Sequence, residues 1–125
     1  MLDASVVLEM LLGTAAGSLL ADRLLHGRRS LHAPHLMDVE VAHVLRRYER
    51  VGDLSPARGA EALTDLTHLP LQRHPHDILL PRIWALRDNL TAYDAAYVAL
   101  AEGLDATLFT RDKKLAVGRR RVELV

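Results

Sequence analysis

The pattern of hydrophobic and polar positions is clearest between residues 90 and 108. Thr91 is a good helix-capping residue, Asp94 follows three positions later, and apolar residues then run almost unbroken to Gly103. Because glycine favours the end of a helix, we expect this helix to end at Gly103. The next run, residues 106–110, has the apolar and β-branched composition of a buried strand. The pattern therefore predicts one helix that begins with a carboxylate and one strand that follows it.

Apolar residues recur at helical spacing in several other segments, and proline and glycine mark some of their ends. We expect Ser5 to cap the first of these helices, and Pro56 fits the first turn of the fourth. The additional predicted helices cover residues 6–12, 15–26, 36–50, 55–68 and 76–87.

Short β-prone runs separate the helices, and one of them contains Pro70, which is tolerated at a sheet edge. The first run, residues 1–2, is shorter than the roughly five residues of an ordinary strand. Strands that alternate with helices indicate parallel pairing through right-handed crossovers. We predict a single domain over residues 1–125, a three-layer α/β/α fold with a parallel central sheet flanked by helices. The predicted strands cover residues 1–2, 31–34, 69–71, 106–110 and 122–125.

Composition supports one core and excludes several kinds of chemistry. Half of the 125 residues are hydrophobic, which is enough for one core. Cysteine is absent, so disulfides, thiolate catalysis and cysteine-based zinc sites are excluded. No apolar run approaches the roughly 20 residues of a membrane span, and no secretory signal pattern opens the chain. We therefore expect a soluble cytoplasmic protein without a membrane partner.

Basic residues are unevenly distributed, although 16 Lys and Arg balance 16 Asp and Glu overall. The balance itself does not indicate nucleic acid. The end of the chain is different, because it holds a basic patch that can meet phosphates or can be a solvated face. The residues of this patch are Arg111, Lys113, Lys114, Arg119, Arg120 and Arg121.

Carboxylates stand at four positions from which they can meet. Asp3 follows the first strand, Asp94 opens the long helix and Asp112 follows the next strand. If these strands are neighbours at a topological switch point, the three acids share one crevice, and Glu40 can reach it from the flank. Glu40 lies on the apolar face of helix 36–50, where an unpaired charge costs several kcal/mol.

Four carboxylates this close repel one another, so the site either raises their pKa values or recruits a cation. Mg²⁺ or Mn²⁺ suits such a site, because these ions take oxygen ligands and bridge to phosphates. Each acid also has an ordinary structural explanation. Asp94 and Asp112 can be helix-capping residues, the latter for a short helix over residues 113–117. Asp3 can belong to a turn, and Glu40 can be a simply partnered side chain.

Motifs in the same order and at the same spacing as in one family span essentially the whole chain. They are Asp3-Ala4-Ser5-Val6-Val7, Glu40 in a helix after Pro34, Leu90-Thr91-Ala92-Tyr93-Asp94-Ala95-Ala96-Tyr97-Val98-Ala99-Leu100-Ala101, and Thr110-Arg111-Asp112. Together they resemble the PIN-domain ribonucleases, most of all the VapC toxins of bacterial toxin–antitoxin pairs. The Asp94-Ala95-Ala96-Tyr97 region is the most specific of them.

The resemblance implies RNA as substrate, a homodimer, and inhibition by a cognate VapB-type antitoxin. It also implies Ser5 and Thr110 as hydroxyl helpers, and His43 stands where many members of the family carry Asn. The residues that it implies as Mg²⁺ ligands and catalytic groups are Asp3, Glu40, Asp94 and Asp112.

The expected reaction is hydrolysis of a phosphodiester. A bound ion would polarise the phosphate and lower the pKa of a coordinated water, and the cut would leave a 5′-phosphate and a 3′-hydroxyl. Asp94 or Glu40 would orient that water as general base. The basic patch from Arg111 to Arg121, with Arg111, Lys113 and Lys114 as its first candidates, would hold the RNA backbone, and Arg28 and Arg29 are a second candidate.

Other readings of the sequence remain open. The same fold can be a non-catalytic module that binds RNA or protein. A receiver-like signalling domain needs a phosphoacceptor Asp after a middle strand, and neither 31–34 nor 69–71 offers one. A nucleotide-binding enzyme would need a Gly-rich phosphate loop, which the chain lacks. The histidine pairs near residues 32 and 74 lack the helical spacing of a zinc enzyme.

Overall fold

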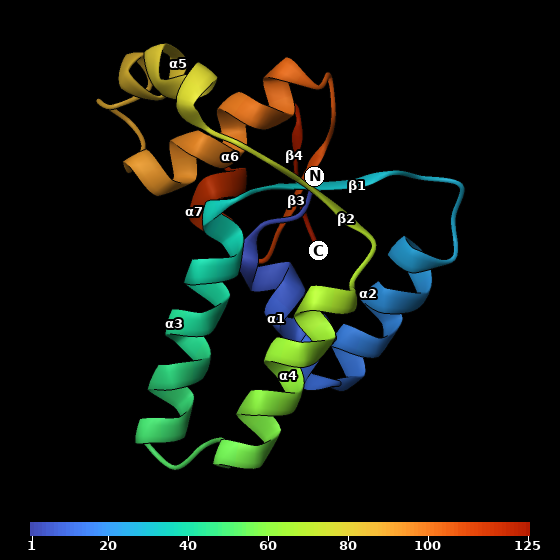
Figure 1. Ribbon diagram of the computed structural model, residues 1–125. Helices are drawn as coiled ribbons and strands as arrows, with labels where there is room; N and C mark the ends of the chain where they lie inside the picture. Colours follow the sequence, from blue (N-terminus) through green and yellow to red (C-terminus); the bar gives the residue numbers. More distant parts are fainter.

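Two pairs of parallel strands lie at the centre of the protein, and residues 1–3 join them (Figure 1). β1 (Leu31–Pro34) pairs with β2 (Leu71–His74), and β3 (Leu108–Thr110) pairs with β4 (Val122–Leu124). Leu2 makes a parallel bridge to Phe109, and its N–H donates to the carbonyl of His32 at 2.9 Å. The extended segments therefore follow the order β4, β3, Leu2, β1, β2. This order makes residues 1–3 the neighbour of β3, as the crevice hypothesis required.

Helices flank both sides of these strands in the structure, a computed structural model that describes all 125 residues. Figure 1 shows α1 to α4 on one side and α5 and α6 on the other, which gives the expected three-layer α/β/α arrangement. The helices are α1 (Ala4–Leu12), α2 (Ala15–Leu25), α3 (Leu36–Arg50), α4 (Pro56–His68), α5 (Leu80–Ala85), α6 (Ala92–Gly103) and α7 (Lys113–Ala116), with a 3₁₀ turn, η1 (Asp77–Leu79), before α5.

The core lies where α1 and α6 meet the strands. Leu2 and Leu108 from the strands are fully buried, and they pack in one cluster with Val6 of α1, Met37 of α3 and Tyr97 of α6. Seven consecutive residues of α6, from Ala95 to Ala101, are buried. This explains why that helix has an almost unbroken apolar sequence rather than a stripe.

Close packing between α1 and α2 depends on two glycines. Gly13 ends α1 in the left-handed conformation at φ 64°, which glycine adopts without strain. Gly17 lets α2 approach α1 directly, because an added Cβ would lie 1.8 Å from the Glu9 carbonyl oxygen. A side chain at position 17 would therefore push α1, which carries part of the cleft described below, away from α2.

Helix boundaries agree with the sequence where a polar cap precedes a strong pattern. Ser55 accepts from the N–H of Arg58 at the start of α4, and Thr91 accepts from the N–H of Asp94 at the start of α6. The prediction for residues 36–50 is confirmed by α3.

The start of α1 differs from the expectation. The cap is Asp3, not Ser5, because the Asp3 carboxylate accepts from the N–H of Val6 and the helix begins at Ala4. The end of α6 also differs. Gly103 stays helical, and the residue with positive φ is Asp105, at 52°.

Two proline-containing segments were also predicted with wrong bounds. The predicted edge strand 69–71 is displaced, because Leu69 caps α4 and β2 begins at Leu71; β2 is nevertheless an edge, since it pairs with β1 alone. The predicted helix 76–87 is divided into η1 and α5, with Pro81 in the first turn of α5. The strand predicted from residue 106 begins at Leu108, and the second helix ends at Leu25.

No single helix is long and apolar enough to cross a membrane. The α1–α2 pair would reach that length and composition only when taken together, and its two helices are bent by 111° at their break.

Candidate active site

All four candidate carboxylates line one open cleft of about 370 Å³. They come from four different segments of the chain: the end of the extended residues 1–3, the middle of α3, the first turn of α6 and the turn after β3. The adjacency of residues 1–3 and β3 brings the first and last of these segments together. The acids on the cleft are Asp3, Glu40, Asp94 and Asp112.

Asp3 is the most firmly held of the four. Its side chain is nearly buried, and Oδ1 accepts from the Ser5 hydroxyl at 2.6 Å and from the Val6 N–H at 3.1 Å. Oδ2 accepts from the hydroxyl of Thr110, which is fully buried at the end of β3. These bonds fix the carboxylate from both sides, so its orientation is set before any ligand arrives.

The two hydroxyl groups are themselves oriented by the backbone after β3. Ser5 Oγ accepts from the N–H of Arg111 at 3.0 Å, and Thr110 Oγ1 accepts from the N–H of Asp112 at 2.9 Å. Each hydroxyl therefore passes a hydrogen bond from a backbone amide to Asp3. The structure thus places Ser5 and Thr110 beside the cleft as supports of Asp3.

Glu40 obtains its partner from α6. Its Oε1 accepts from the hydroxyl of Tyr97 at 2.8 Å, and the Tyr97 ring is buried in the core. This bond explains how a carboxylate can occupy the apolar side of α3. The second oxygen, Oε2, accepts no hydrogen bond and belongs to the cleft lining.

Asp94 and Asp112 have structural roles as well as a place on the cleft. Asp94 lies in the first turn of α6, where a negative charge is favoured by the helix dipole. Asp112 caps α7, because its Oδ1 accepts from the N–H of Lys114 at 2.8 Å. The ordinary explanation and the functional one are thus compatible for these residues.

The acids shift one another's titration in the direction expected of a crowded site. Burial raises the pKa of Asp3, although its hydrogen bonds oppose the change. Burial also raises the pKa of Glu40, and the charges of Asp94 and Asp3 add to the rise. The pKa of Asp94 is raised by burial and then by the charge of Asp112. Repulsion among the cleft acids is therefore present without a bound cation.

The donor chemistry of the cleft fits a hard divalent cation. It offers carboxylate oxygens, and one oxygen of Glu40 and one of Asp112 accept no hydrogen bond from the protein. In the side-chain positions of the structure, no three His, Asp or Glu residues are arranged to hold one ion. Bringing Glu40, Asp94 and Asp112 onto one ion beside the fixed Asp3 therefore requires these three side chains to rotate.

The basic residues predicted to bind substrate do not all reach this cleft. Arg111 lines it, with Nε 3.5 Å from Oε1 of Glu9. Lys113 and Lys114 are exposed on α7 and lie outside the lining. The second set, Arg28 and Arg29, is exposed in the turn before β1 and is also outside it.

Sequence reasoning missed three lining side chains that can contact a ligand. Tyr97 lies three residues after Asp94, and this spacing, which puts both on one side of α6, was the available signal. Arg47 and Tyr48 follow Glu40 by two turns on α3, and this spacing was the available signal. Arg47 adds a positive charge to the rim of the acidic cleft.

Comparisons with known proteins agree on one family. The PIN domain family matches residues 1–119 of the chain. Ribonuclease VapC1 of Mycobacterium tuberculosis strain H37Rv is 43% identical over 115 residues, which is 91% of this chain and 86% of that protein. Ribonuclease VapC9 of the same strain is 44% identical over 116 residues, again 91% and 86% of the two chains.

A solved structure supports the same fold. The crystal structure of PAE2754 from Pyrobaculum aerophilum superposes with a TM-score of 0.72 at 25% sequence identity. The match covers 97% of this chain and 79% of that one. With this fold, the family match over most of the chain and the relatives above, the chain belongs to the PIN domain family and, within it, to the VapC-type ribonucleases.

Proposed function

We propose that this protein is an Mg²⁺-dependent endoribonuclease toxin that hydrolyses RNA phosphodiester bonds at the cleft of Asp3, Glu40, Asp94 and Asp112. The observation that carries the proposal is the convergence of these four acids, from four segments, on one cleft. Burial raises the pKa of Glu40, and the charges of Asp94 and Asp3 raise it further, so the acids of the cleft repel one another. Such a site is typical of metal binding and catalysis.

The four carboxylates would hold Mg²⁺, with Mn²⁺ as a possible substitute. When bound, the ion supplies charge neutralisation at the scissile phosphate and a water of lowered pKa. Asp3, fixed by Ser5 and Thr110, would keep its oxygens in place throughout. Asp94 or Glu40 would orient the attacking water as general base, and a raised pKa suits that role because it brings the group nearer neutral pH.

Arg111 is the basic residue best placed to contact RNA beside the acids, since it lines the cleft. Lys113 and Lys114 would contact the backbone farther out, from the exposed surface of α7. The names of the VapC relatives support a VapB-type antitoxin as partner, and a homodimer in the cytoplasm is proposed with it.

Cleavage of a mixed RNA pool by the purified protein in Mg²⁺ tests the proposal. Asp94→Asn keeps the shape of the side chain while removing its charge, and should lower the cleavage rate by about 10²–10⁴-fold. EDTA should abolish cleavage by the wild type. Asp53→Asn is a matched control, because Asp53 is exposed in the turn between α3 and α4 and does not line the cleft.

Each pattern of results has a definite meaning. Cleavage that is lost in Asp94→Asn and in EDTA but retained in Asp53→Asn supports the metal-dependent nuclease. Cleavage that survives EDTA would contradict the metal, and cleavage that survives Asp94→Asn would contradict the site. A folded wild type, free of antitoxin, that cuts neither the pool nor individual tRNAs and rRNA fragments would favour the non-catalytic binding module.

A further inference from the structure

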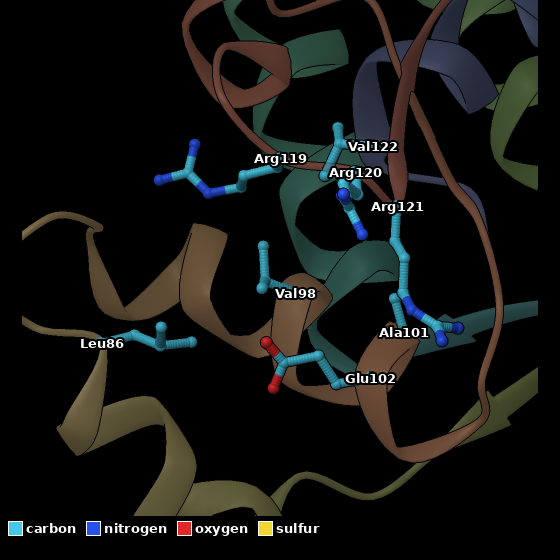
Figure 2. A pocket seen from close by; sticks show the side chains of 8 residues that line it. All are labelled: Leu86, Val98, Ala101, Glu102, Arg119, Arg120, Arg121 and Val122. Atoms are coloured by element: carbon cyan, nitrogen blue, oxygen red, sulfur yellow. The ribbon is translucent and has the colours of Figure 1, made fainter.

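A second pocket, of about 300 Å³, lies on the same face of α6 as the acidic cleft but closer to the carboxyl end of that helix. Its floor is apolar, and three consecutive arginines form the opposite wall; we call it the arginine pocket. Figure 2 shows the side chains of Arg119 and Arg121 extending away from each other, with Arg120 between them. The full lining is Leu86, Val98, Ala101, Glu102, Arg119, Arg120, Arg121 and Val122.

Two of the three arginines in this pocket form no ion pair with the protein. Arg120 has no acidic partner, and Arg119 donates to backbone carbonyls, 2.9 Å from that of Leu115. Arg121 pairs with Asp105. The only carboxylate in the lining, Glu102, is already held by Arg82, outside the pocket, through two bonds of 2.7 and 3.0 Å. The pocket therefore attracts anions.

The arginine pocket and the acidic cleft are connected by α6. Asp94, Val98, Ala101 and Glu102 follow one another at helical spacing on a single face, which spans about 12 Å at 1.5 Å per residue. A chain that leaves the cleft along this face reaches the arginines within a few nucleotides.

We propose that the arginine pocket is a second RNA-binding subsite, which holds a phosphodiester a few nucleotides from the cut with the adjoining ribose or base on its apolar floor. The inference rests on the proposed function for the choice of RNA as ligand. Guanidinium groups match phosphate oxygens in a bidentate way, and an apolar floor accepts the face of any base. The subsite therefore adds affinity and orientation with little base selectivity.

Continuity with the cleft favours RNA over an acidic protein segment as occupant. A polynucleotide has one phosphate for every nucleotide, so a strand that runs from the acids along this face of α6 presents another phosphate near the arginines. An acidic peptide would meet the repelling carboxylates of the cleft at the other end of the same face. Acids beside the first turn of α6 and arginines beside its last turns suit a strand whose phosphate in the cleft is accompanied by a cation.

Binding of a fluorescently labelled single-stranded RNA, measured by anisotropy in EDTA, tests the subsite without cleavage. A probe of about 12 nucleotides is long enough to reach both sites. Arg120→Ala should weaken binding of this probe several-fold and reduce the slope of log K against log salt by about 0.7. Arg46→Ala is the matched control, because Arg46 is exposed on α3 and lines neither site.

The inference is overturned if Arg120→Ala binds the probe as tightly as Arg46→Ala, or if the wild type does not bind it. It is also overturned if hexaglutamate, and not RNA, shows Arg120-dependent binding, or if Arg120→Ala changes the molar mass measured by light scattering. The last two results would assign the pocket to an acidic protein partner or to contact between copies. Cleavage in Mg²⁺ tests the nuclease separately, so an inactive protein with Arg120-dependent RNA binding would refute the proposed function and keep the subsite.

Discussion

The acidic cleft and the arginine pocket lie along one face of α6, yet they hold a glutamate in opposite ways. In the arginine pocket, two hydrogen bonds from Arg82 lower the pKa of Glu102. In the acidic cleft, burial raises the pKa of Glu40, and its one hydrogen bond comes from the neutral hydroxyl of Tyr97. The charge of Glu102 is thus balanced by an arginine of the protein, whereas Glu40 lies among other carboxylates.

This difference shows which region of the protein gains stability from a bound ligand. An acid beside an arginine is stable without further help, whereas acids that face one another gain stability only when a cation joins them. Natural proteins keep such locally unfavourable arrangements where binding or catalysis requires them. The comparison therefore identifies the cleft as the region that depends on a ligand. This conclusion can be tested by changing the partners of the cleft acids.

The largest effect is expected from Asp3→Ala. This change removes the cap of α1 and leaves the hydroxyls of Ser5 and Thr110 without their acceptor, so it should destabilise the protein by about 2–4 kcal/mol and abolish cleavage. Urea unfolding in EDTA measures the first effect. Ser55→Ala removes only the cap of α4, and should cost about 1 kcal/mol while leaving cleavage intact. Equal losses in the two variants would show that the hydroxyl bonds add nothing.

A smaller effect is expected from Tyr97→Phe, which removes the only hydrogen bond to Glu40 without changing the packing of the ring. We expect a loss of about 1 kcal/mol in unfolding free energy and a cleavage rate lowered by about tenfold, because Glu40 loses its fixed orientation. Tyr93→Phe is the control, since Tyr93 is exposed outside the cleft lining and its hydroxyl makes no hydrogen bond to the protein. Unchanged cleavage in Tyr97→Phe would mean that Glu40 needs no such support.

The smallest effect is a dependence of stability on pH in the absence of metal. The raised pKa values of Asp94 and Glu40 mean that the folded state binds more protons than the unfolded state between about pH 4 and those raised values. The contribution of these groups to stability therefore falls as pH rises through that window. The side chain at position 94 of Asp94→Asn carries no charge, so this variant loses less stability as pH rises. In EDTA its Tm should therefore exceed that of the wild type by a few degrees at pH 7 and by less at pH 4.

The difference in Tm between the wild type and Asp94→Asn separates the titration of the cleft acids from that of other groups. Burial, followed by the charges of His74 and the N-terminal amine, lowers the pKa of His32, which makes stability rise with pH in an overlapping range. That contribution is common to both proteins and cancels. Added Mg²⁺ should raise the Tm of the wild type more than that of Asp94→Asn. A Tm difference that does not change with pH would contradict the electrostatic strain described here.

Much of the fold was predictable because local signals and tertiary packing agree. Ser55 and Thr91 cap helices whose apolar pattern is strong, and α3 has a clear apolar stripe. The predicted and observed boundaries differ where tertiary contacts determine the local structure. Residues 1–3 are extended because they lie between β1 and β3, and Asp3 caps α1 because Ser5 is used elsewhere, in bonds to Asp3 and to the backbone at 111.

The site was predictable to a similar degree. The four acids could be placed together because the ends of neighbouring parallel strands meet, and the need of Glu40 for a partner was visible from the apolar side of α3. The identity of that partner was not visible, because a tyrosine in an apolar helix resembles an ordinary core residue. Nor could the sequence separate the basic patch into Arg111 on the cleft, Lys113 and Lys114 on exposed α7, and the three arginines of the second pocket.

The hydrogen bond between Thr110 and Asp3 spans 107 positions of the chain. A chain still being made on the ribosome, and long enough to contain α1 to α5, has two of the four acids and lacks the strand that holds residues 1–3 in place. The cleft is complete only when β3 and α7 have emerged. A chain cut short before β3 therefore lacks both the strand that positions Asp3 and the two remaining acids of the cleft.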